Sequence, residues 1–77
     1  MALITDAAIT WSGSVTLATD EIWQTRKGKV FLTTTATPAI DDGIEMPENH
    51  AIRFAAGASV SYRKEGPTEA LIVRETV

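Results

Sequence analysis

The chain has 77 residues, of which 44% are hydrophobic, and its formal net charge is −3 at pH 7. This length predicts a single domain, 1–77, with a thin core, and the hydrophobic fraction is typical of a folded chain. The acidic balance disfavours nucleic acid as a partner, the absence of cysteine excludes disulfides and thiolate-bound zinc, and no run approaches the about 20 apolar residues of a membrane helix.

The N-terminal segment lacks the basic start and the apolar stretch of about 7–15 residues that define a signal peptide. Leu3, Ile4 and Ile9 nevertheless make it partly apolar. An apolar segment on a small domain is commonly buried against other protein surface. Two alternatives stay open: residues 1–10 form an arm that packs on another subunit, or they form one more strand of the same core.

Period-two alternation of apolar and polar residues, broken by turn signals every about 8–12 residues, predicts an all-β fold. No segment keeps a helical periodicity for more than a turn. The many short strands favour a small antiparallel β-sandwich or a jelly-roll-like barrel. The expected strands are Ser14–Thr19, Glu21–Thr25, Val30–Thr35, Ile44–Met46, His50–Phe54, Ser59–Arg63 and Ala70–Arg74.

The alternation also predicts which side chains face the core. Ile22 and Trp23 point to opposite faces of one strand, so we expect one of them to meet another chain. Val60 and Tyr62 oppose the polar residues between them, which predicts a half-buried strand. The unbroken apolar run 71–73 is suited to a central strand that is packed on both sides.

Two turns have local signals. Gly28, in the sequence Arg26-Lys27-Gly28-Lys29, predicts a hairpin turn with a positive φ at the glycine. The segment 47–49 predicts a corner between strands, in which Pro47 fixes φ and Asn49 adopts a left-handed conformation. The corner leaves His50 at the surface, at the start of a strand.

His50 is the only histidine, whereas a metal site in a small jelly roll needs two or three histidines with a carboxylate. We therefore expect no metal, no cofactor and no catalytic residue. Acidic pairs occupy positions where turns favour acidic side chains, and the serines have no histidine relay beside them in the sequence. These residues are Asp41, Asp42, Glu45 and Glu48, and Ser12, Ser14, Ser59 and Ser61.

What remains is a surface for partners. Trp11 and Trp23 are the predicted interface anchors, because tryptophan is enriched at binding hot spots, and a place in the core is the open alternative for each. Together with Leu3, Ile4 and Ile9 they make up the predicted interface.

The order of the sequence blocks resembles small structural proteins of tailed bacteriophages and gene transfer agents, of the head-decoration or spike-base type. The blocks are Val15–Gly28 with its DEIWQ-x-R-x-G motif, the loop Pro38–Gly43, Ile52–Arg63 with I-x-F-x-A-G-x-x-V, and Ala70–Glu75. The resemblance covers the chain from about Val15 to its end, and the first motif is its most distinctive part.

The resemblance implies a virion protein with a compact β fold and no enzymatic activity. It implies assembly as a homo-oligomer on the capsid surface, contact with the major capsid protein or another virion protein, and synthesis in the host bacterial cytoplasm. Neither a nucleic acid nor a membrane is an expected partner. The alternative hypothesis is a soluble β-sandwich binding module that recognises a host-surface glycan through an exposed tryptophan.

Overall fold

The computed structural model describes residues 2–77, and in this part of the chain it contains eight strands and no helix. It therefore holds no helix long and apolar enough to cross a membrane within the described range. The strands are β1 (Ala2–Ile4), β2 (Val15–Thr16), β3 (Glu21–Lys27), β4 (Val30–Thr33), β5 (Ile44–Met46), β6 (Ala51–Phe54), β7 (Ser59–Lys64) and β8 (Leu71–Thr76).

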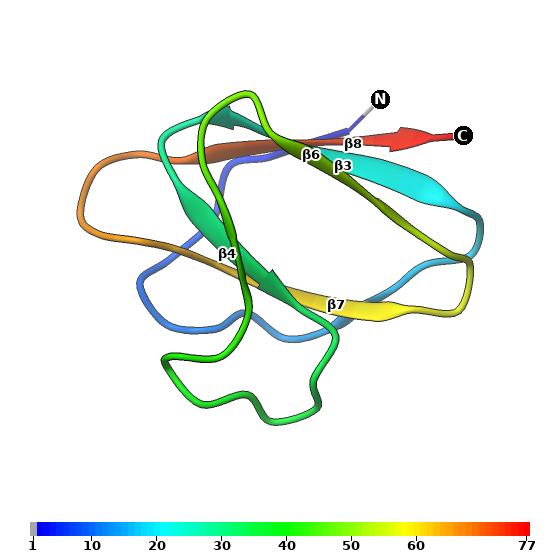
Figure 1. Ribbon diagram of the computed structural model, residues 1–77, viewed down its shortest axis with the longest axis horizontal. Helices are drawn as coiled ribbons and strands as arrows, with labels where there is room; N and C mark the ends of the chain where they lie inside the picture. Colours follow the sequence, from blue (N-terminus) through cyan, green and yellow to red (C-terminus); the bar gives the residue numbers. More distant parts are fainter. Residues whose placement is uncertain (1) are drawn as a thin grey trace.

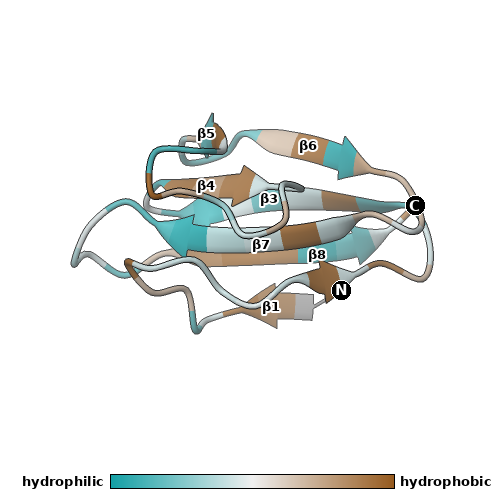
Figure 2. Cartoon of the chain, turned by 90° about the horizontal axis from the view of Figure 1, so that it is seen from below, coloured by the Kyte–Doolittle hydropathy of each residue, from teal (hydrophilic) through white to brown (hydrophobic). Residues whose placement is uncertain are grey.

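The strands form two four-stranded sheets, with the orders β1-β8-β3-β6 and β2-β7-β4-β5. We call them the β3 sheet and the β7 sheet. All neighbouring strands are antiparallel. Figure 1 shows β8 and β3 along one side of the molecule and β7 along the other, and Figure 2 shows hydrophobic and hydrophilic segments along the same strands. The all-β prediction is confirmed, and the architecture is a small β-sandwich.

The core lies between the two sheets and is organised by β3. Glu21, Trp23 and Thr25 are buried, while Ile22 between them is 41% exposed. This alternation places the tryptophan inside and the isoleucine outside, as the strand periodicity predicts. Other buried members of the core are Leu17, Val30, Leu32, Met46, Phe54, Val60, Tyr62, Ala70 and Ile72.

Trp23 contacts both layers of the sandwich. Its ring meets Phe54 of β6 edge-on, with 5.7 Å between centroids, and lies 6.3 Å from Tyr62 of β7. Its indole N–H donates to Glu21 Oε1 over 3.1 Å. Arg74 donates to both oxygens of Glu21, at 2.9 and 3.0 Å, and these bonds lower the pKa of that carboxyl. The buried polar atoms around the tryptophan are thus hydrogen-bonded, as burial requires.

The N-terminal segment is part of the domain. β1 pairs with β8, so the structure shows the second of the two alternatives for residues 1–10, although Met1 lies outside the described residues. Asp6 accepts a hydrogen bond from the Tyr62 hydroxyl at 2.8 Å, and Lys64 N donates to Ala8 O at 2.8 Å. These bonds fasten residues 6–8 to β7.

The turn at Gly28 has the predicted positive φ, 74°, but the hairpin prediction is wrong. The turn connects β3 to β4, which belong to different sheets. β3 is already paired on its two sides by β8 and β6, so β4 has no free edge to join. A Cβ at Gly28 would approach Glu69 O to 2.8 Å, which is a second reason for glycine there.

The prediction that β7 is half-buried is also wrong, because its outward side chains are covered. Ser61 is 5% and Arg63 is 8% exposed. The Arg63 guanidinium lies over the rings of Phe31, at 4.2 Å, and Trp11, at 5.4 Å, and its Nη2 donates to Ile40 O at 2.7 Å. The central position of the run 71–73 is confirmed, since β8 lies between β1 and β3.

Burial and the hydrogen bond to Asp6 raise the pKa of Tyr62 to about 12. This value exceeds the about 10 of an unfolded tyrosine, so the stabilisation is complete below about pH 10 and is lost as the pH rises through about 12. Tyr62 is the only tyrosine, so near-ultraviolet absorbance follows its ionisation directly. We expect Asp6→Ala to lower this pKa and Asp41→Ala, the control, to leave it unchanged. Ionisation near pH 10 in the folded wild-type protein would refute the assignment.

Candidate functional site

The outer face of the β3 sheet carries exposed aliphatic side chains. Ile22 of β3 is 41% exposed and Leu3 of β1 is 49% exposed. Val73 of β8 stands directly opposite Leu3 and is 4% exposed, so it lies among its neighbours on this face. The face therefore carries two exposed aliphatic side chains, Ile22 and Leu3, while Val73 between their strands is buried.

Charged side chains lie on both sides of Ile22 on this face. Ile22 stands opposite Arg53 of β6 on one side and opposite Glu75 of β8 on the other, so all three share the outer face. Arg53 donates to Asp20 at 3.0 Å. The pKa of Asp20 is lowered, first by a hydrogen bond from Ala56 N and then by Arg53. Among residues 2–77, Glu75 has no ion-pair partner.

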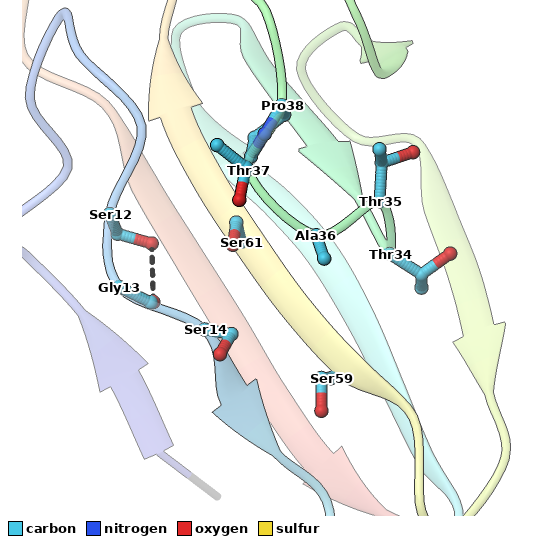
Figure 3. Close-up of a pocket in the computed structure, with 10 residues that line it drawn as sticks. All are labelled: Ser12, Gly13, Ser14, Thr34, Thr35, Ala36, Thr37, Pro38, Ser59 and Ser61. Carbon is cyan, nitrogen blue, oxygen red and sulfur yellow. Dashed lines mark hydrogen bonds between the residues drawn. The ribbon is translucent and has the colours of Figure 1, made fainter.

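A second candidate is a pocket of about 460 Å³ over the outer face of the β7 sheet, drawn in Figure 3. It is lined by Ser12, Gly13, Ser14, Thr34, Thr35, Ala36, Thr37, Pro38, Ser59 and Ser61. Its polar side chains are all hydroxyls, and none of the lining residues is ionisable. Such a lining can hydrogen-bond a neutral polar ligand, but it offers no general acid or base.

Trp11 lies beside this pocket and supports the loop between β4 and β5. Its indole N–H donates to Ala39 O at 2.7 Å, and its ring lies over Arg63. Gly43, with φ 106°, lets the loop approach the ring, since a Cβ there would come within 2.7 Å of it. Trp11 is half-buried, and its polar atom is occupied within the chain.

The predicted interface residues divide into three groups. Leu3 and Ile9 are exposed, at 49% and 51%. Ile4 packs against the core and Trp11 is half-buried under a loop. Trp23 is 0% exposed, so it belongs to the core and the prediction that it anchors an interface is wrong.

Of Ile22 and Trp23, it is Ile22 that lies at the surface, and Trp23 takes the core position that was its open alternative. The alternation placed the two on opposite faces, but it did not tell which face is the inner one. The larger tryptophan is inside because it fills the space between two sheets, where Phe54 and Tyr62 meet it.

His50 lies at the surface, directly before β6, as predicted. The corner that leads to it has Asn49 at φ 72°, which confirms the left-handed conformation. The backbone pairs with β3, since Thr25 N donates to His50 O at 3.0 Å and Asn49 N donates to Thr25 O at 2.7 Å. Within residues 2–77 no three histidine, cysteine or acidic residues lie close enough to hold a metal ion.

Three of the four acidic residues considered as acid and base pairs make separate contacts within the chain. Asp42 caps its own turn by accepting from Ala39 N at 2.8 Å, and Glu48 accepts from Gly28 N at 3.2 Å. Glu45 pairs with Lys29 at 3.2 Å. These carboxylates thus stabilise turns and surface ion pairs. The four serines considered in the sequence analysis, in contrast, all line the pocket.

Comparison of the chain with protein-family models, with curated proteins and with solved structures found no match. A small β-sandwich by itself is compatible with many functions.

Proposed function

We propose that the protein is a non-enzymatic structural protein of a bacteriophage or gene-transfer-agent particle that assembles as a homo-oligomer on the capsid surface. The order of the sequence blocks from Val15 onward supports the virion assignment. The observation that carries the mode of action is the presence of two exposed aliphatic side chains, Ile22 and Leu3, on the outer face of the β3 sheet. Its partners would be further copies of the chain and the major capsid protein or another virion protein.

The physical advantage of assembly is large for a domain of this size. A chain of 77 residues has a total stability of about 4–12 kcal/mol, and cysteine is absent from it. Each exposed aliphatic side chain that a neighbour covers contributes about 25 cal/mol per Å² of buried apolar surface. Binding to the folded form alone stabilises that form by mass action.

The outer edges of the sheets are compatible with controlled assembly. β1 and β5 have three residues each and β2 has two, so these edges offer little backbone for unspecific pairing. β6, the longest edge strand, carries the charge of Arg53. Short or charged edges favour recognition through side chains on the sheet faces.

The non-enzymatic part of the proposal is supported by the chemistry of the pocket. A hydroxyl group needs an adjacent base to act as a nucleophile, and neither histidine nor a carboxylate lines this pocket. Three of the four carboxylates considered as acid and base, Asp42, Glu45 and Glu48, form a turn hydrogen bond or an ion pair away from the pocket.

The test is purification of particles from cells that produce the protein. We expect it in particles in a stoichiometric copy number. Ile22→Lys, on the proposed face, should lower its occupancy by about tenfold or more, which corresponds to about 1.4 kcal/mol of binding free energy. Ile44→Lys is the matched control, because Ile44 is equally aliphatic and 49% exposed but lies on the β7 sheet. Particles that lack the protein would end the proposal.

The hydroxyl-lined pocket favours a second candidate function, a module that binds a host-surface glycan, because neutral sugars present many hydroxyl groups. Trp11 lies close enough to the loop to report on binding, whereas Trp23 is buried. A glycan ligand should change the tryptophan fluorescence saturably, and Thr34→Val and Thr35→Val should each weaken that response. Indifference to a broad panel of glycans would count against this function.

A further inference from the structure

One row of side chains on the outer face of the β3 sheet is complementary to itself. The cross-strand register aligns Glu75 of β8, Ile22 of β3 and Arg53 of β6 in this order. The row thus has an anion at one end, a cation at the other and an exposed aliphatic side chain in the middle. All three residues are exposed.

Symmetry determines how two such rows can meet. Most protein dimers have a two-fold axis, and a face that pairs with itself must be complementary under that rotation. An axis that lies between the faces, passes by Ile22 and runs parallel to the strands reverses the row. It puts Ile22 on its equivalent and Arg53 on Glu75 of the other copy. An axis perpendicular to the strands would put each charge on its like, which is repulsive.

We propose that a second copy of this chain covers the outer face of the β3 sheet in a two-fold symmetric dimer, in which Ile22 packs on its equivalent and Arg53 of each copy pairs with Glu75 of the other. The inference deepens the homo-oligomer part of the proposed function and rests on it for its biological setting. It identifies the occupant of this face and leaves the β7 sheet for contacts with other chains.

In the single chain, Glu75 and Arg53 can each form a further ion pair. Within residues 2–77 Glu75 has no ion-pair partner. Arg53 is held by Asp20 through one nitrogen, Nη2, and its side chain is 60% exposed. A guanidinium has five N–H donors, so the bond to Asp20 leaves donors for a second carboxylate. Asp20 also holds Arg53 at the rim of the sheet, which limits the entropy that pairing would cost.

The size of the face predicts a weak dimer. Four strands at a spacing of about 4.8 Å make a face about 14 Å wide between the outer strands, so the buried area is below the about 1,600 Å² of a standard interface. We expect a dissociation constant of the order of 100 µM in solution. On a particle surface, neighbouring copies are held at a high effective concentration, and a weak contact of this kind then forms.

Charge reversal tests the geometry. Glu75→Arg gives a face with two cations, and Arg53→Glu gives one with two anions, so each variant alone should dimerise at least about tenfold more weakly than wild type. An equimolar mixture of the two variants restores both ion pairs. We expect the mixed dimer to form with an affinity within about threefold of the wild-type value. Sedimentation analysis up to about 1 mM measures each of these constants.

The controls separate the contact from the fold. Glu65→Arg reverses a charge that pairs with Lys29, away from the proposed face, and should leave dimerisation unchanged. Near-ultraviolet circular dichroism checks that each variant is folded. If Arg53→Glu unfolds because of its proximity to Asp20, the double variant Asp20→Asn/Arg53→Glu removes that repulsion and takes its place in the mixture.

The dimer is refuted if the wild-type chain is monomeric at about 1 mM, or if the mixture associates no better than either variant alone. Particle occupancy is measured separately. Occupied particles together with a monomeric chain would refute the dimer and retain the proposed function. If the mixture of variants dimerises as expected but the protein is absent from particles, the proposed function is refuted and the dimer is retained.

Discussion

Trp23 lies between the two sheets with none of its side chain exposed, and its ring meets aromatic side chains from both of them. Large aromatic side chains dominate the energetics of a small core. Its indole N–H donates a hydrogen bond to Glu21, and Arg74 donates two hydrogen bonds to the same carboxylate. These bonds satisfy the polar atoms that are buried with the tryptophan. The interaction fixes the position of β3 in the middle of its sheet, between β8 and β6.

The position of β3 in turn determines the surface. A shift by one residue would exchange the faces of the whole strand, bringing Ile22 inside and Trp23 outside. Because the tryptophan holds the register, Ile22 is presented outward between Arg53 and Glu75. One strand therefore supplies both the main core residue and the centre of the proposed contact between copies. The stability of the fold and the proposed contact between copies therefore depend on the same strand.

Local patterns predicted much of this fold, because period-two alternation and turn chemistry depend on neighbouring residues. They predicted a strand at the place of each of β2 to β8, with bounds that differ by a few residues, and the positive φ values at Gly28 and Asn49, while β1 was one of two alternatives for the N-terminal segment. They did not give the connection of β3 to β4 across the sheets, which depends on which edges other strands have already occupied. The contact of Trp11 with Arg63, and the convergence of distant serines in one pocket, likewise join segments far apart in the sequence. Periodicity named Ile22 and Trp23 as alternatives, and only the packing decided between them.

The most direct measurement is urea unfolding of Trp23→Ala beside Ile22→Ala, at a protein concentration too low for self-association. We expect Trp23→Ala to lower the free energy of unfolding by about 3–5 kcal/mol, a large part of the total stability, and Ile22→Ala to lower it by less than about 1 kcal/mol because its side chain is on the outer face. Equal and small losses in the two variants would contradict the central role of the buried tryptophan.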